Sequence, residues 1–558
     1  MSSPSSRFGP AALTTAGILL AATVFALALQ PLWSNDLWWH LATGRYLLET
    51  RGFLDTDPFS IAGNSISPGR TTILNGYWLA QVIMAGCYNL AGERGVILLR
   101  AALLTAVPVL LLAYGRRRGL SAWPLLLAAA LTGWTLLYFT AERPNLFTIL
   151  FVPALVCLLD RIGPAPRQKP FPGYALGWTA AVGVLLLAWA NMHGGFILGA
   201  AVVGCYLLGE TAKVFLLRLP VPRRALALLW GSLGAALLAT LATPAGIAPY
   251  LDFIGFQGGV LQEKTAEFLN PFAAAASGVA VYPYFLAGLL FAALLLRRRR
   301  QVDLTEAAIG LFLLAVSLTA FRYLPLFVGG VGLFVARELT RLEDEIPAVR
   351  KALPAAVLLT LLAAGVCEGP AAAGKFREYG LLRGRTEAGL FPQQAADFLE
   401  REQLTGVRFG HFNWGGYLAW RQRDGSRVFI DGRVLNLPLF HAYTRILWIP
   451  EEMRGLLDRY GVTTIVMPRL NPSTGELYAL TEFLALAPEW LLAYRDETAM
   501  VMVRRGSFPQ LPDHRTLPKR LIYQDVLADA GRRLQAGERP DHLLKAREAA
   551  LRHLSAPP

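Results

Sequence analysis

The clearest candidate for catalysis lies directly after the first long apolar stretch. Asp36 occupies the sequence SNDLWWH, where the chain leaves that stretch. A carboxylate at such a boundary can accept a proton from a hydroxyl group or help to hold a divalent metal. The alternative is a structural N-cap, because Asn and Asp favour the residue before a helix. His40 lies one turn later on the same helix face and is either a further metal ligand or an interfacial residue.

A second acidic element follows in the sequence GFLDTDP, where Asp55 and Asp57 form a D-x-D pair. Such a pair can bind Mg²⁺ or Mn²⁺, and the metal can neutralise a phosphate leaving group. Together with His40, the pair forms the metal-binding set that the sequence predicts. The alternative is ordinary turn chemistry, because Asp is common in turns and Asp57 precedes Pro58.

Four basic residues are candidates for binding a phosphorylated substrate: Arg143, His193, Lys264 and Arg322. Three of them lie at the ends of predicted membrane spans, and Lys264 lies in a loop. Ionisable groups at membrane depth are costly and usually face a cavity or a partner. The fork of donors on Arg also matches phosphate oxygens. The alternative for each residue is anchoring of a long side chain at the lipid headgroups.

Two further motifs lie in the less apolar carboxyl-terminal part of the chain. Asn413 and Trp414 belong to NWGGY, and FIDGR ends in the triplet Asp431, Gly432 and Arg433. Both motifs follow predicted strands, where loop residues often bind substrates. Asn413 and Trp414 are therefore candidate substrate-binding residues. The competing interpretation, which the pattern favours, is a structural turn with an aromatic packing anchor.

These residues need a scaffold, and the composition indicates a membrane protein. Of the 558 residues, 54% are hydrophobic and 16% are charged, whereas soluble proteins carry about 25% charged residues. Apolar runs of roughly 16–20 residues recur, which matches a hydrocarbon core of about 30 Å. We predict about eleven spans, near residues 11–32, 94–114, 120–140, 145–160, 175–191, 194–210, 225–242, 279–296, 304–320, 323–338 and 352–367.

The distribution of positive charge predicts how these spans are oriented. Arg residues cluster in alternate loops, for example at Arg116–Arg118, Arg223–Arg224 and Arg297–Arg300, and the positive-inside rule places such loops in the cytoplasm. An odd number of spans then places the candidate residues, and the chain after about residue 368, outside. Because much of the net charge of +14 comes from these clusters, we do not infer nucleic-acid binding.

We predict three parts: a transmembrane domain at 1–368 with a first outer loop at 33–93, an extracytoplasmic α/β domain at 369–514, and a helical appendage at 515–558. The loop is expected to form interfacial helices at 37–49 and 73–93, with Trp38 and Trp39 at the headgroup level. The α/β domain is expected to hold one sheet with strands at 407–409, 427–430, 463–467, 490–495 and 499–504, and helices at 392–403 and 451–460.

This arrangement resembles the GT-C superfamily of membrane glycosyltransferases. The strings SNDLWWHLATGRYLLE, DTDPFS, ERPNLFT, NMHGGF, NWGGYL and FIDGR are also similar to those of a group of bacterial glycosyltransferase-like membrane proteins. The resemblance implies a polyprenyl-phosphate or polyprenyl-diphosphate sugar donor, Asp36 as the catalytic acidic residue of the first loop, and Asp55 or Asp57 as a second acidic element. NWGGYL lacks the Asp of the WWDYG motif found in the superfamily's oligosaccharyltransferases, which argues against a peptide acceptor.

The sequence therefore predicts a glycosyltransferase of the bacterial cytoplasmic membrane. It would transfer a hexosyl or pentosyl group, with inversion, from a polyprenyl-phosphate donor to a glycan, lipid or protein acceptor outside. In this hypothesis Asp36 deprotonates the acceptor, while Arg143, Arg322 or Lys264 meets the donor phosphate. The alternative is a non-catalytic transporter or a scaffold for lipid-linked glycans. A transporter should carry ionisable residues in mid-span and interrupted helices in matching halves, and neither is evident in the sequence.

Overall fold

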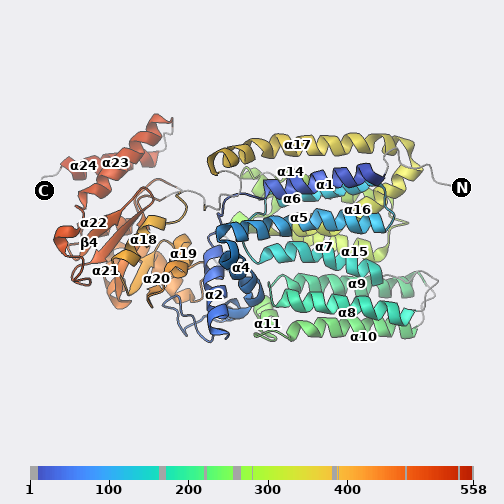
Figure 1. The fold of residues 1–558 in the computed structure, drawn as a ribbon, viewed down its shortest axis with the longest axis horizontal. Coiled ribbons are helices and arrows are strands. Elements are labelled where there is room, and N and C mark those ends of the chain that lie inside the picture. Colours follow the sequence, from blue (N-terminus) through green and yellow to red (C-terminus); the bar gives the residue numbers. More distant parts are fainter. Residues whose placement is uncertain are drawn as a thin grey trace. The chain divides into compact units, whose positions relative to one another are not determined.

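The computed structural model describes residues 10–162, 171–218, 223–255, 266–279, 281–379, 386, 389–471, 474–537 and 541–555. It divides into two compact units (Figure 1). Unit 1 consists of Met1–Leu32 and Asn75–Arg385, and unit 2 consists of Trp33–Leu74 and Thr386–Pro558. The predicted outer loop at 33–93 is therefore divided: its first part belongs with the carboxyl-terminal residues and its second part with the apolar helices.

Unit 1 is a bundle of apolar helices that run side by side (Figure 1). Its α-helices are α1 (Pro10–Leu27), α4 (Trp78–Ala91), α5 (Glu93–Arg117), α6 (Ala122–Leu136), α7 (Asn145–Ile162), α8 (Phe171–Ala190), α9 (Phe196–Leu216), α10 (Arg223–Leu238), α11 (Ala248–Gly255), α13 (Pro271–Ala276), α14 (Tyr282–Arg297), α15 (Leu304–Ser317), α16 (Leu324–Glu345) and α17 (Pro347–Tyr379). The described part of unit 1 also contains the short 3₁₀ helices η1 (Ala239–Leu241), η2 (Ala266–Phe268) and η3 (Phe321–Tyr323). The boundary between the two units in the sequence, after Leu74, falls within the short helix α3 (Thr72–Asn75).

Among the described residues, six helices are long and apolar enough to cross a membrane, and five shorter helices are also apolar. Each of the eleven predicted spans falls on one of these helices. The predicted helical architecture is thus confirmed, while the number of membrane crossings stays a prediction. The expected helices of the outer loop are present as α2 (Leu37–Thr50) and α4.

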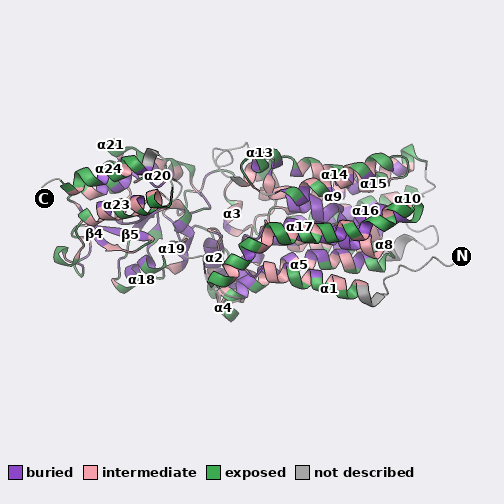
Figure 2. Cartoon of the chain, turned by 90° about the horizontal axis from the view of Figure 1, so that it is seen from above, coloured by how far each residue is buried: buried purple, intermediate pink, exposed green. Residues whose placement is uncertain are grey.

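Helix α16 lies at the centre of unit 1, because 83% of its most apolar stretch is buried, against 11% for α17. Figure 2 shows α17 as a largely exposed helix. Glycines on α16 allow this central packing: a Cβ at Gly330 would lie 2.4 Å from Leu313 Cδ1 on α15, and one at Gly332 would lie 2.8 Å from Leu111 Cδ1 on α5. Small residues of this kind let membrane helices approach closely.

Unit 2 contains a five-stranded sheet in the order β2-β1-β3-β5-β4. The strands are β1 (Val407–Gly410), β2 (Arg427–Val428), β3 (Val462–Pro468), β4 (Trp490–Arg495) and β5 (Ala499–Arg504), and each coincides with a predicted strand. Strands β2, β1 and β3 are parallel, and β5 pairs antiparallel with both β3 and β4. The other helices of unit 2 are α18 (Gln393–Arg401), η4 (Phe412–Trp414), α19 (Gly415–Arg421), α20 (Leu437–Trp448), α21 (Pro450–Arg459), α22 (Ala479–Leu486), η5 (Asp513–Arg515), α23 (Arg520–Gln535) and α24 (Asp541–Ser555).

The segment 33–74 joins unit 2 by pairing with the edge of this sheet. Ser60 forms a parallel bridge with Val428, Ile61 N donates to Val428 O at 2.9 Å, and Val428 N donates to Phe59 O at 2.9 Å. Helix α2 packs on α19, where the Trp38 ring makes edge contacts with Phe391 and Tyr417. Trp38 is 2% exposed and Trp39 is 6% exposed. The two rings are therefore buried in unit 2 and do not lie at the headgroup level as we expected.

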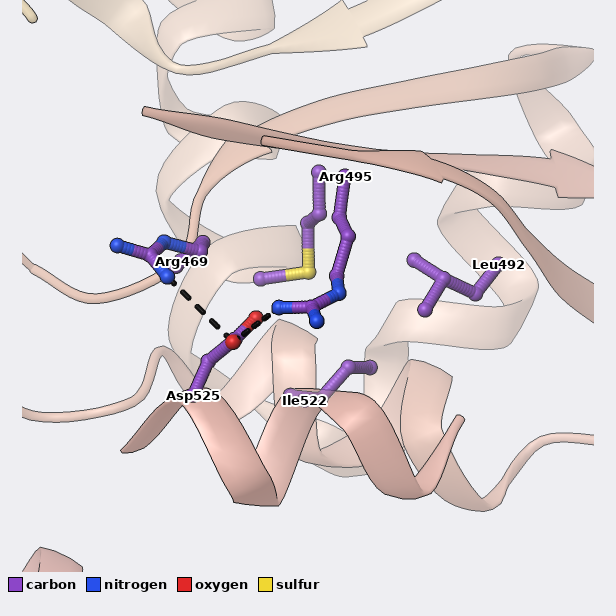
Figure 3. A pocket seen from close by; sticks show the side chains of 6 residues that line it. Arg469, Leu492, Arg495, Ile522 and Asp525 are labelled. Atoms are coloured by element: carbon purple, nitrogen blue, oxygen red, sulfur yellow. Dashed lines mark hydrogen bonds and ion pairs between the residues drawn. The ribbon is translucent and has the colours of Figure 1, made fainter. Parts of the chain in front are cut away.

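The carboxyl-terminal helices α23 and α24 pack against each other, with Tyr523 stacked on His553. A pocket where α23 meets the sheet is lined by Arg469, Leu492, Arg495, Met500, Ile522 and Asp525 (Figure 3). Asp525 of α23 forms ion pairs with Arg469 and Arg495 from the sheet side. We interpret this pocket as the docking contact of the appendage, because Asp525 of α23 pairs there with two arginines from the sheet side.

Candidate active site

Asp36 stands at the start of α2, in the N-cap position. Its side chain makes no capping hydrogen bond to the helix; instead, Oδ1 accepts a hydrogen bond from Nε1 of Trp39 at 3.1 Å. The N-cap alternative therefore describes the place of this residue but not the role of its carboxylate. This hydrogen bond orients the carboxylate, and a carboxylate is a group that can accept a proton from a hydroxyl.

The two glycine motifs of the carboxyl-terminal part allow α2 to approach. A Cβ at Gly432 would lie 2.6 Å from Asp36 Oδ1, so the carboxylate lies against the backbone of this turn. A Cβ at Gly416 would lie 3.3 Å from both Asn35 O and Trp39 N, and one at Gly415 would lie 2.1 Å from Ile430 O. Three separate sequence motifs, SNDLWWH, NWGGY and FIDGR, thus meet around Asp36 within unit 2.

Arg433 lies at the centre of a buried group of charges beneath this turn. Its guanidinium donates to both oxygens of Asp431, at 2.9 Å from Nε and 2.6 Å from Nη2, and its Nη1 lies 2.9 Å from Asp57 Oδ1. Burial opposes the charge, but Asp431 and Asp57 outweigh it and raise the pKa of Arg433 above its ordinary value. The turn is held in addition by a hydrogen bond from Arg433 N to Asp431 Oδ1 at 2.9 Å.

The two acids of the D-x-D pair lie in different environments. Asp55 is exposed, whereas Asp57 is 1% exposed. Besides Arg433, Asp57 accepts hydrogen bonds from Phe59 N at 3.3 Å, from Ser60 N at 3.1 Å and from the Ser60 hydroxyl. Both oxygens of Asp57 are thus already engaged, and one of them faces a cation. The contacts of Asp57 therefore do not fit the metal-binding role that was predicted for the D-x-D pair.

His40, the third predicted metal ligand, is buried and its ring packs on that of Trp39. Among the described residues, no three His, Cys, Asp or Glu side chains are arranged to hold a metal ion. We therefore derive no catalytic step through a metal.

In the NWGGY motif, Trp414 is buried and its Nε1 donates to Leu390 O at 2.8 Å, as the packing-anchor interpretation expects. Asn413 next to it is exposed.

Three of the four predicted phosphate-binding residues lie together in unit 1. Arg143 forms an ion pair with Glu267 at 2.6 Å, and both side chains are partly exposed. The guanidinium of Arg322 lies 5.1 Å from the ring of Phe268, the residue after Glu267. Arg322 is also close enough to His193 to contribute to the lowered pKa of that residue. Lys264 lies outside the described residues.

His193 is held as a neutral ring in the turn between α8 and α9. Burial, with a contribution from Arg322, lowers the pKa of His193 to about 3. Its Nδ1 accepts a hydrogen bond from Gly195 N at 3.0 Å and lies 2.8 Å from Thr148 Oγ1, which itself accepts from Trp189 Nε1. Since Nδ1 is the acceptor, Nε2 carries the proton. His193 is therefore a neutral hydrogen-bond donor beside Arg322.

Sequence reasoning missed Arg100 in unit 1 and Trp39 in unit 2. Arg100, inside α5, is fully buried with Glu142 as its ion-pair partner, and it donates to Ala28 O and Thr140 O. It thereby fixes the end of α1 against the segment that carries Arg143. The available signal was a lone Arg within the predicted span at 94–114, which is costly without a partner. The expectation that no ionisable residue lies inside a span is therefore wrong for Arg100. Trp39 was also missed as a partner of Asp36, because we interpreted its ring as a headgroup anchor.

Comparison with known proteins gives similarity in fold only. No protein-family model matches the chain, and no curated protein matches its sequence. Solved structures do match. The oligosaccharyltransferase AglB from Archaeoglobus fulgidus, in complex with an inhibitory peptide and a dolichol-phosphate, has a TM-score of 0.58 at 11% identity, with 90% of this chain and 75% of that chain covered. Its apo form gives a TM-score of 0.59 at 11% identity, covering 93% and 78%.

A third match is ArnT from Cupriavidus metallidurans in the apo state, with a TM-score of 0.50 at 14% identity, covering 89% of this chain and 98% of that chain. AglB and ArnT are both GT-C membrane glycosyltransferases. The chain shares the fold of these proteins. This confirms the resemblance that the sequence motifs indicated, at the level of the fold, and it includes the helical bundle of unit 1 as well as unit 2, because most of the chain is covered.

Proposed function

We propose that this protein is a membrane glycosyltransferase of the bacterial cytoplasmic membrane. It transfers a sugar from a polyprenyl-phosphate-linked donor to an acceptor hydroxyl outside the cytoplasm. The observation that carries the proposal is the setting of Asp36 at the start of α2 in a GT-C fold, where its carboxylate accepts a hydrogen bond from Trp39 and lies against the glycine turn at Gly432. AglB, which has the same fold, was solved with a dolichol-phosphate, a lipid phosphate of the proposed donor class.

The proposed reaction is a direct displacement. Asp36 accepts the proton of the acceptor hydroxyl while the oxygen of that hydroxyl forms a bond to the anomeric carbon of the donor sugar. The bond between that carbon and the phosphate oxygen breaks, and polyprenyl phosphate leaves with the negative charge. One displacement inverts the configuration at the anomeric carbon. We assign stabilisation of the leaving phosphate to Arg143, Arg322 and the neutral donor His193, because guanidinium groups match phosphate oxygens.

The test is Asp36→Asn, which removes the proton acceptor and keeps the shape of the side chain. We expect sugar incorporation into the envelope glycan of the host to fall by at least about a hundredfold at matched protein levels, the range of lost acid–base catalysis. Glu49→Gln is the matched control, because it removes an exposed carboxylate from the same helix and should leave incorporation unchanged.

Unchanged incorporation in Asp36→Asn would remove Asp36 from the mechanism. If variants of Trp414 or Asp431 abolished incorporation while Asp36→Asn did not, the protein would instead be a scaffold that binds lipid-linked glycans through unit 2.

A further inference from the structure

We propose that Trp39 is a positioning residue for Asp36, and that Asp57 acts in this arrangement as a clamp on Arg433 and not as a metal ligand. The proposal rests on the proposed function, since it assumes that Asp36 is the proton acceptor. It concerns four residues of unit 2 that form a connected series: Asp57, Arg433, Trp39 and Asp36.

The first contact in the series is between Trp39 and Asp36. The indole Nε1 donates to Asp36 Oδ1 at 3.1 Å, and the indole is buried, so its orientation is set by packing. A hydrogen bond to an ionised carboxylate is stronger than one between neutral groups. It fixes one oxygen of Asp36, and with it the direction in which the carboxylate faces the acceptor.

The second contact is between Trp39 and Arg433. The guanidinium carbon of Arg433 lies 6.0 Å from the Trp39 ring and 5.4 Å from the Phe59 ring, within the range of cation–π attraction. The side chain of Arg433 is 1% exposed. A buried guanidinium that is fixed by carboxylates cannot change rotamer without leaving charges unpaired, so it is a rigid support for the indole.

The third contact assigns a role to Asp57. Its carboxylate lies 2.9 Å from Arg433 Nη1 and accepts two backbone N–H groups and one hydroxyl from Phe59 and Ser60. A metal ion at Asp57 would have to displace these donors and would be repelled by the guanidinium. The geometry therefore connects the second acid of the D-x-D pair to Asp36 through Arg433 and Trp39.

The decisive variant is Trp39→Phe, which keeps a ring and removes the N–H donor. Trp38→Phe is the matched control on the same helix: Trp38 is buried against Phe391 and Tyr417, and its Nε1 makes no hydrogen bond with the described residues. We expect Trp39→Phe to lower kcat by about tenfold to a hundredfold with KM for the donor within about twofold, because the lost contact orients the catalytic group. Trp38→Phe should keep kcat within about threefold even if it lowers the Tm.

Equal effects of the two substitutions on kcat would overturn the positioning role. Asp36→Asn separates this failure from that of the proposed function. If Asp36→Asn is inactive while Trp39→Phe behaves like Trp38→Phe, only the positioning role fails. If Asp36→Asn is active, Asp36 is not the proton acceptor, and the part of the proposed function on which the positioning role rests fails.

Asp57→Asn tests the clamp, because the amide keeps the size of the side chain and loses its charge. Acting through Trp39, Asp57→Asn should lower kcat, and the double variant with Trp39→Phe should be no more than about threefold slower than Trp39→Phe alone. The Mn²⁺ concentration for half-maximal activity, titrated after chelator treatment, should be unchanged, or activity should not depend on Mn²⁺. Multiplied effects in the double variant, or a raised half-maximal Mn²⁺ concentration, would overturn the clamp in favour of a metal ligand.

Discussion

At the scale of single residues, the D-x-D pair shows how one sequence pattern covers two physical situations. Only Thr56 separates the two acids in the sequence, yet Asp55 is exposed and Asp57 is buried beside Arg433. The pattern is compatible with metal binding, with a turn or with an ion pair, because spacing along the chain does not encode burial. The partner of Asp57 lies in FIDGR, far away in the sequence. Only the fold shows that Asp57 is already paired with the guanidinium of Arg433.

His411, which follows β1, supports a prediction about stability and pH. Burial lowers the pKa of His411 to about 4, and its ring packs near those of Trp414 and Tyr478. In the unfolded chain a His titrates near 6.5. As the pH falls from 6.5 to 4, the unfolded state therefore binds a proton that the folded state does not, and the free energy of unfolding decreases, by up to about 3 kcal/mol.

The measurement is the unfolding of the purified protein in detergent between pH 4 and pH 8. His411→Gln should lose this part of the pH dependence, whatever its effect on stability at pH 8. The same substitution at exposed His441 controls for the loss of a surface imidazole. An identical pH dependence in the wild type and in His411→Gln would contradict the prediction.

At the scale of secondary structure, the elements could be predicted well and their partners could not. The periodicity of residues 37–49 predicts a helix, and α2 is present. The same pattern placed Trp38 and Trp39 at a lipid surface, because an aromatic face fits headgroups and protein equally well. The packing partner of α2 is α19, which begins in the NWGGY motif. Their contact depends on glycines that allow the two helices to approach closely, and this role can be recognised only from the packed helices.

The packing of α19 on α2 gives a prediction for Gly416. A methyl group there would lie 3.3 Å from Trp39 N, so the start of α2 must shift by a few tenths of an ångström. We expect Gly416→Ala to lower activity by about threefold to tenfold, since small displacements of a catalytic group are costly. The free energy of unfolding should change by less than about 1 kcal/mol, because Ala also favours the helix.

Gly455→Ala is the control for this substitution. A Cβ at Gly455, on α21, meets nothing within 4 Å, so the added methyl group should leave activity unchanged and stabilise the helix slightly. Both measurements need only the transfer assay and a denaturation curve. Equal activity of the two alanine variants would mean that α19 does not control the position of Asp36.

At the scale of the whole molecule, the apolar stretches and the strands could be predicted because each is a local pattern of hydrophobicity. The division into units could not. Residues 33–74 follow the first apolar helix, yet they add a strand pairing at Val428 and a buried acid at Asp57 to the carboxyl-terminal unit. Such long-range pairings leave no periodic signal in a single sequence. The meeting of SNDLWWH, NWGGY and FIDGR was therefore a result of the structure, although each motif had been noted separately.

The distribution of charge over the whole chain makes a final prediction about orientation. If the Arg-rich loops face the cytoplasm, unit 2 lies outside. In a variant without the four native cysteines, a cysteine in place of exposed Glu497, in the β4–β5 turn, should react with a membrane-impermeant maleimide on intact spheroplasts. A cysteine in place of exposed Arg300, after α14, should react only once the membrane is permeabilised. Labelling in the reverse order would place Asp36 in the cytoplasm and exclude a donor that is used outside. Labelling of both positions in intact spheroplasts would show that the predicted odd number of crossings between Arg300 and Glu497 is wrong.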